Sequence, residues 1–253
     1  MKNIIKSDLY YYRKNLIYFF GALTIFLIYF GVGAIGVNTY SYKGDIYSLF
    51  ELFRLILIQN YIIVLVICII LTSVMQGKIL SNMFYRYQLT ASCTEKVLFS
   101  KYLIQYIFNL LFCIVAYGTA TIIMSFVTHR NLICEFLTNP YCLLALITET
   151  ILLLNFTIQT VSIVIWEKNG IMGAIINWFI IATTMLPLLL SNYAEELSFL
   201  ERISEWLLPG QMSLVGRMEM VNGIFVKSVI TSIVKIIVFW LLTINFMKKK
   251  EFT

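Results

Sequence analysis

The sequence predicts an all-α membrane protein with six transmembrane helices. The mean hydropathy is +0.86, and 60% of the residues are hydrophobic whereas only 13% are charged. This composition is typical of a polytopic membrane protein. The chain also holds six apolar runs near the length of about 20 residues that crosses a hydrocarbon core of about 30 Å. Within a single domain over residues 1–253, these predicted spans are 16–37, 55–77, 102–128, 141–165, 171–191 and 224–246.

The segment before the first span is predicted to form an N-terminal interfacial helix. Ile4, Ile5, Leu9 and Tyr12 recur at helical spacing among lysines and an arginine. A plain basic flank of the first span is the alternative interpretation. The first span is too long for the apolar core of a signal peptide, and no small-residue cleavage pattern follows it, so we expect it to remain in the protein.

The distribution of Lys and Arg predicts that both termini lie in the cytoplasm. Basic residues are retained on the cytoplasmic side during membrane insertion. With the N-terminus inside, most of the 19 Lys and Arg residues fall on that side. This asymmetry, together with anionic lipid of the inner leaflet, accounts for the net charge of +6 without a nucleic-acid partner.

The connection between spans two and three, residues 78–101, is predicted to be a basic, amphipathic cytosolic insert. From its start, apolar residues recur on one face of a helix that ends near Thr90. Residues 92–95 (Ser-Cys-Thr-Glu) then match a capping box, which predicts a new helix that runs into the third span. Lys96 and Lys101 are expected to hold their charges near the headgroups through their long side chains. A connecting loop with an interfacial helix is the plainer alternative.

Between spans five and six, residues 192–223 are predicted to form short outer helices. Apolar residues up to Leu207 follow one face of a helix, with glutamates around them. After Pro209 and Gly210, a second short helix is expected. The glutamates indicate a solvated acidic face rather than a specific substrate site.

The five cysteines include no Cys-x-x-Cys pair and have no histidine at ligand spacing, so no metal site is expected. Cys134 and Cys142 would both lie near the outer face. A disulfide between them and two separate packing thiols both remain open, because the sequence does not give their Cα separation.

Glu149 and Lys235 are the ionisable residues that lie deepest in the predicted spans. Each costs about 2.5 to 3.5 kcal/mol at a helix centre on insertion scales, so they should not face lipid. At about 1.5 Å per residue they lie about 12 Å and about 17 Å from the outer ends of their spans, so an ion pair is geometrically allowed. With Asn155 and Gln159 they form either a polar element of a translocation path or structural contacts between helices.

The order of these elements resembles the type II ABC exporter permeases. The resemblance begins with the six spans and the N-terminal helix. Residues 78–101 add a helix, a break and a second helix, in which Lys101 enters the third span. The outer segment adds a Leu-Leu-Pro-Gly break at 207–210. The resemblance implies that the segment between spans two and three is a coupling helix that docks on an ATPase. The matching positions are Tyr85, Arg86, Tyr87, Gln88, Leu89 and Thr90.

The nucleotide site is expected on a partner, because no Gly-x-x-x-x-Gly-Lys-[Ser/Thr] motif occurs in this chain. The resemblance implies a permease subunit that is not itself an enzyme and binds no cofactor. Two ATPase subunits would bind ATP and Mg, and a second permease chain, identical or paralogous, would complete the transporter. No importer-type Glu-Ala-Ala loop is present, which favours export.

The cargo that the resemblance favours is an amphipathic peptide such as a bacteriocin or cytolytic toxin, giving secretion or producer immunity, with a drug or lipid as alternative. The abundance of Ile, Lys, Asn and Tyr is typical of AT-rich bacterial genomes, so we expect a bacterial cell membrane. An intramembrane protease of the prenyl-protease-like class is a competing hypothesis. However, Glu195, Glu196 and Arg202 have the wrong spacing, and His129 is the single histidine. A passive channel or scaffold is a third class.

Overall fold

The computed structural model describes residues 2–41, 49–81, 94–128, 140–191, 199–216 and 223–251. Within these ranges every regular element is a helix, so the prediction of an all-α fold is confirmed for the described part of the chain. The helices are α1 (Lys2–Lys14), α2 (Leu16–Ser41), α3 (Leu49–Ser81), α5 (Thr94–Thr128), α7 (Pro140–Glu167), α8 (Gly170–Ser191), α9 (Phe199–Ser204), α10 (Leu208–Gly216) and α11 (Ile224–Glu251).

Five of the described helices, α3, α5, α7, α8 and α11, contain segments that are long and apolar enough to cross a membrane. α2 adds a shorter apolar stretch, Leu16–Ile28, within the part whose side chains are described. The protein is therefore a multi-pass membrane protein by the length and composition of its helices. Each of the six predicted spans falls within one long helix.

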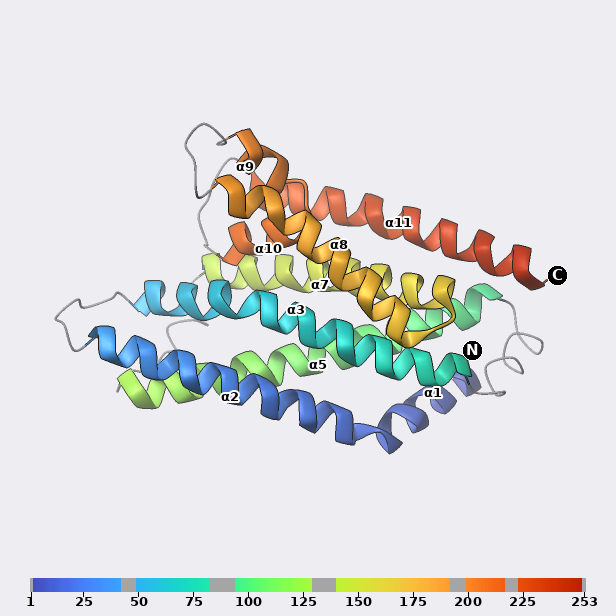
Figure 1. Ribbon diagram of the computed structural model, residues 1–253, viewed down its shortest axis with the longest axis horizontal. Helices are drawn as coiled ribbons and strands as arrows, with labels where there is room; N and C mark the ends of the chain where they lie inside the picture. The colour runs from blue at the N-terminus through green and yellow to red at the C-terminus, as the bar shows by residue number, and fades with distance from the viewer. Residues whose placement is uncertain are drawn as a thin grey trace.

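The long helices run side by side along the longest axis of the molecule, and both termini lie at the same end (Figure 1). α1 lies at this terminal end, where the chain turns at Asn15 before it enters α2. α9 and α10 lie toward the opposite end. We refer to these two ends as the terminal end and the α9–α10 end.

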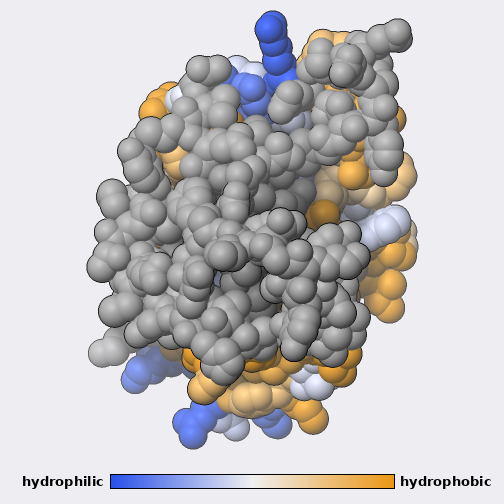
Figure 2. Space-filling model, turned by 90° about the vertical axis from the view of Figure 1, so that its left-hand side faces the viewer, coloured by the Kyte–Doolittle hydropathy of each residue, from blue (hydrophilic) through white to orange (hydrophobic). Residues whose placement is uncertain are grey.

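α7 forms the centre of the bundle, because it packs against α3, α5, α8, α10 and α11. Its core side chains, among them Leu152, Phe156 and Val161, are buried. α8 and α11 instead expose apolar rows such as Ile230, Ile237 and Leu241 on α11. Hydrophobic residues, drawn in orange, line the flanks of the bundle when it is viewed from its α9–α10 end (Figure 2). Apolar faces of this extent indicate contact with lipid.

α3 and α8 approach each other closely at the terminal end through two glycines. A Cβ atom at Gly77 would lie 2.8 Å from the Cα of Gly170, and one at Gly170 would lie 2.4 Å from the carbonyl oxygen of Ser73. Backbone atoms fill both spaces, so only glycine fits. The last turns of α3 are thereby held against the start of α8.

The break in the outer segment falls earlier than the sequence predicted. α9 ends at Ser204, and Pro209 and Gly210 lie in the first turn of α10 instead of separating the two helices. Proline is tolerated there because the first turn of a helix leaves its N–H groups without intrahelical acceptors. A Cβ atom at Gly210 would lie 2.1 Å from the carbonyl oxygen of Ser204, so glycine allows α10 to fold back onto the end of α9.

Candidate functional site

A buried ion pair joins α1 to α5 at the terminal end of the bundle. The ammonium of Lys101 donates to Oδ1 of Asp8 at 2.5 Å, and the side chains are only 2% and 4% exposed. The hydroxyl of Ser100 donates to the other carboxylate oxygen of Asp8 at 2.8 Å. Burying either charge alone would be costly, and the pair compensates part of this cost through charge and hydrogen bonds. α1 therefore occupies one defined position on α5.

One helical turn beyond Asp8, Tyr12 continues the polar contacts into the bundle. Its hydroxyl donates to Oε1 of Gln105 and accepts a hydrogen bond from Nε2 of Gln76 at 2.7 Å. Burial raises the pKa of Tyr12 well above its ordinary value, the Asp8 carboxylate raises it further, and the hydrogen bond from Gln76 acts in the opposite direction. The phenol therefore keeps its proton and remains a hydrogen-bond donor to Gln105.

Deeper in the bundle, amide and hydroxyl groups carry the hydrogen bonds on to α7. Nε2 of Gln105 donates to Oδ1 of Asn109 at 2.9 Å. The amide of Asn109 then donates to Oγ1 of Thr72 at 3.3 Å and to Oγ1 of Thr157 at 3.1 Å. All four side chains are buried. A continuous set of polar side chains thus connects α1, α3, α5 and α7.

We call these side chains the polar network. Its hydrogen bonds form two groups, one helical turn apart along α1 and α5: Asp8 with Ser100 and Lys101, and Tyr12 with Thr72, Gln76, Gln105, Asn109 and Thr157.

The sequence interpretation missed the polar network, although the spacing of its members could have indicated it. Lys101, Gln105 and Asn109 follow one another at steps of four residues along α5. The same step separates the two network residues on α1 and the two on α3. Residues four apart lie on one face of a helix, so three polar stripes in apolar helices predict a shared polar contact.

The expectation that Lys101 reaches the headgroups is wrong. Lys101 points into the protein because the Asp8 carboxylate accepts its charge there. Lys96, for which the same behaviour was expected, is exposed. The two lysines differ because only Lys101 lies on the face of α5 that packs against α1.

The predicted docking positions, Tyr85–Thr90, lie outside the described residues. Their flanks are described: α3 ends at Ser81 and α5 begins at Thr94, near the predicted helix restart. In the first turn of α5, Glu95 accepts from Lys248 of α11 at 3.0 Å, and both side chains are about half exposed. The start of α5 and the end of α11 are therefore neighbours at the terminal end.

The structure does not bring Glu149 and Lys235 together. The ammonium of Lys235 donates to the carbonyl oxygen of Trp206 at 3.1 Å, in the connection between α9 and α10. Among the ion pairs of the described residues, none joins it to Glu149, which is half-buried on α7. The long side chain of Lys235 instead carries its charge to a backbone acceptor beside α11, as snorkelling lysines do.

Asn155 and Gln159 are both buried on α7, one turn apart. Nδ2 of Asn155 donates to Oγ of Ser232 on α11 at 3.4 Å, while its Oδ1 atom has no hydrogen-bond partner within the described part of the chain. Asn155 thus contributes to the contact between α7 and α11. A role of either residue in a translocation path remains a prediction.

Both alternatives for Cys134 and Cys142, a disulfide or two packing thiols, stay open, because Cys134 and the side chain of Cys142 lie outside the described part of the chain. Cys68 of α3 and Cys113 of α5 are free thiols. In the described ranges, no group of three or more His, Cys, Asp or Glu side chains is arranged to hold a metal ion.

The fold and the polar network define the class of the protein as a multi-pass, all-α membrane protein. Comparison with known proteins found no matching family model, no similar curated protein and no similar solved structure.

Proposed function

We propose that the chain is the transmembrane subunit of an ATP-driven type II exporter that works with separate ATPase subunits. The observation that carries the proposal is the buried Asp8–Lys101 pair, which fixes α1 to the first turns of α5. α5 follows directly after residues 82–93, which contain the predicted docking positions Tyr85–Thr90. A displacement of this segment by an ATPase would act on α5 and α1 together.

The contacts beyond α1 would carry such a displacement to the centre of the bundle. Asn109 of α5 is hydrogen-bonded to Thr157 of α7, and Gly77 at the end of α3 touches Gly170 of α8. Both helices that flank residues 82–93 are thus tied to helices of the core. Packed helices move as rigid bodies between discrete arrangements, which suits alternating or lateral access driven by a partner.

In this proposal the terminal end faces the cytoplasm of a bacterial cell, and the α9–α10 end faces outward. The common position of both termini supports an even number of crossings (Figure 1). A cytoplasmic terminal end places residues 82–93 on the side where ATP and ATPases are found. It also agrees with the retention of basic residues inside.

The favoured cargo is an amphipathic peptide such as a bacteriocin or cytolytic toxin, with a drug or lipid as alternative. Exposed apolar and aromatic side chains such as Trp178 and Phe179 of α8 support a cargo that enters from the membrane. A second permease chain would supply the other wall of the path, since α7 of one copy is packed against five neighbouring helices. Export of such a peptide would give secretion or producer immunity.

The test is co-expression with the ATPase encoded by a neighbouring gene, followed by co-purification and measurement of vanadate-sensitive ATP hydrolysis in nanodiscs. Arg86→Ala and Leu89→Ala should lower both the recovery of the ATPase and its hydrolysis rate. Lys96→Ala is the matched control, because Lys96 is exposed at the terminal end outside the docking positions. Unchanged recovery and hydrolysis in the two docking variants would contradict the coupling role. No associated ATPase at all would favour a passive channel or scaffold.

A further inference from the structure

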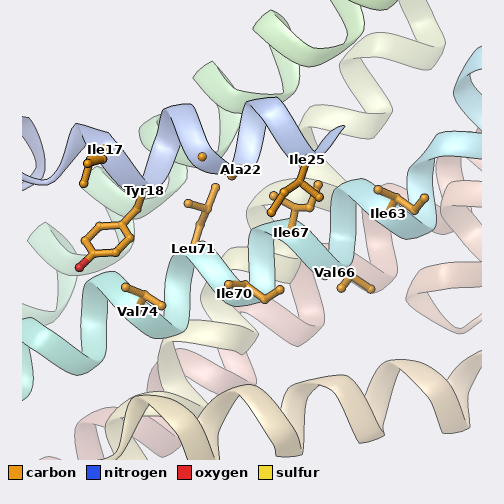
Figure 3. A pocket seen from close by; sticks show the side chains of 11 residues that line it. Ile17, Tyr18, Ala22, Ile25, Ile63, Val66, Ile67, Ile70, Leu71 and Val74 are labelled. Carbon is orange, nitrogen blue, oxygen red and sulfur yellow. The ribbon is translucent and has the colours of Figure 1, made fainter. Parts of the chain in front are cut away.

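An apolar groove with a volume of about 470 Å³ lies between α2 and α3 and opens to the outside of the bundle. Figure 3 shows isoleucine, valine and leucine side chains from both helices along its length, with Tyr18 at one end and Ile63 at the other. Gly21 also lines the groove, and a Cβ atom added there would have no neighbour within 4 Å. The groove is therefore open space beside a lipid-facing surface.

The length of the groove matches one leaflet of a bilayer. On α3 its lining runs from Ile63 to Val74, which is about 17 Å at about 1.5 Å per residue. A single leaflet accounts for about 15 Å of a hydrocarbon core of about 30 Å. The groove also runs along the helix axes, in the direction in which an acyl chain extends.

The groove ends at a cation on the terminal side of the bundle. Lys78 lies one helical turn beyond Val74, is exposed, and donates to the hydroxyl of Tyr18. Its ammonium also lies 4.2 Å from the centre of the Tyr18 ring. Because Lys78 is exposed, its positive charge is accessible to an anionic group at this end of the groove.

We propose that the groove holds an acyl chain of an anionic membrane phospholipid whose phosphate binds Lys78. A phospholipid meets both requirements of the site, because its chain is apolar over the length of a leaflet and its phosphate is anionic at headgroup depth. A neighbouring copy of this chain is the competing occupant, and the oligomeric state of a groove variant distinguishes it from a lipid. The proposal depends only on the membrane location and not on the proposed exporter function.

The test is native mass spectrometry of the delipidated, full-length protein titrated with dioleoyl phosphatidylglycerol or dioleoyl phosphatidylcholine. Gly21→Leu fills the groove and should weaken retention of both lipids about tenfold, the equivalent of about two buried methylene groups. Gly118→Leu is the matched control, because Gly118 of α5 also has open space around a Cβ atom and does not line the groove.

The charge is tested separately with Lys78→Gln. This variant should lower the preference for phosphatidylglycerol over phosphatidylcholine about fivefold, as expected for one basic residue at a membrane surface. Glycerol 3-phosphate carries an anionic phosphate without acyl chains and should not displace the lipid. Its displacement of the lipid would contradict an acyl-chain site.

Two further results would overturn the proposal. One is equal lipid retention by Gly21→Leu and Gly118→Leu. The other is a change of oligomeric state in Gly21→Leu, measured in the same spectra, with lipid retention unchanged. That outcome would identify the groove as a contact between two copies of the chain. If Gly21→Leu cannot be purified, an unaltered lipid preference in Lys78→Gln is sufficient to reject the site.

Discussion

Removing one member of the Asp8–Lys101 pair should cost more stability than removing both. Asp8→Asn or Lys101→Met leaves a buried charge without its partner, which typically costs about 3 to 5 kcal/mol. The double variant has no buried charge, so its loss should be smaller than the sum of the two single losses. Denaturant unfolding in detergent micelles, analysed as a double-mutant cycle, gives the interaction free energy.

The control for this cycle is the pair of Glu95 and Lys248, whose side chains are 50% and 51% exposed. Glu95→Gln and Lys248→Met should each change the free energy of unfolding by less than about 1 kcal/mol, because water screens an exposed pair. If the losses of Asp8→Asn and Lys101→Met simply add in the double variant, as expected for the control pair, the two buried side chains do not stabilise each other.

Tyr12→Phe should destabilise the protein by about 1 to 3 kcal/mol, because Gln76 and Gln105 lose a buried hydrogen-bond partner.

Tyr12 also predicts that the free energy of unfolding depends on pH. Its pKa is raised in the folded state, so its contribution to stability is complete below the ordinary value of 10.0 and is lost as the pH rises above it. Tyr12→Phe should therefore reduce the loss of stability above about pH 10, measured by unfolding at several pH values.

Tyr10→Phe serves as the control for this prediction, because Tyr10 lies on the same helix and is 70% exposed. It should change neither the stability at neutral pH nor the slope at high pH. Equal behaviour of the two variants would contradict the role given to the Tyr12 hydroxyl.

For single residues, the sequence identifies the charged side chains in apolar helices but not the partners that they contact. Lys101 and Lys235 both lie in apolar helices, yet one pairs with Asp8 and the other with a backbone carbonyl. The partner of each lysine depends on the rotation of its helix, which tertiary packing sets. For Asp8, which precedes the first predicted span, hydropathy indicated no buried role.

At the scale of helices, Gly77→Ala should separate α3 from α8. The added methyl group would lie 2.8 Å from the Cα of Gly170, and backbone cannot move aside as a flexible side chain can. Overpacking of this kind typically costs about 1 to 3 kcal/mol. Thermal unfolding measures the loss, and faster hydrogen exchange at the start of α8 would locate it.

Gly118→Ala is the matched control for the helix contact, since a Cβ atom at Gly118 meets no atom within 4 Å. Alanine favours the helical conformation by about 1 kcal/mol over glycine, so this variant should be neutral or slightly more stable. A Gly77→Ala variant as stable as Gly118→Ala would mean that α3 and α8 do not meet as closely as described.

Hydropathy located the long helices well but underestimated their length. The predicted second span begins at residue 55, whereas α3 begins at Leu49. Hydropathy measures the part of a helix that lies in hydrocarbon, while the hydrogen bonds of the helix continue into the headgroup region. The predicted break between α9 and α10 is misplaced for a different reason: Pro209 lies in the first turn of α10, where proline is tolerated and does not break a helix.

At the scale of the whole molecule, composition gave the fold class but not the order of helices from centre to surface. The apolar window of α7 has a mean hydropathy of 1.6 and that of α11 has 2.1, yet α7 is central and α11 is peripheral. Both lipid and a membrane-protein core accept apolar side chains, so hydropathy does not separate them. The buried polar residues of α7, such as Asn155 and Thr157, mark the central helix better.

The orientation of the molecule in the membrane can be measured by labelling thiols at its two ends. Two single-cysteine variants are made in a protein without native cysteines. Lys96→Cys places one exposed thiol at the terminal end, and Phe199→Cys places one on α9 at the opposite end. Because basic residues are retained in the cytoplasm, a membrane-impermeant maleimide should label Phe199→Cys in intact cells and Lys96→Cys only after permeabilisation. The reverse pattern would place residues 82–93 outside the cell, where no cytoplasmic ATPase reaches them, and would contradict the exporter proposal.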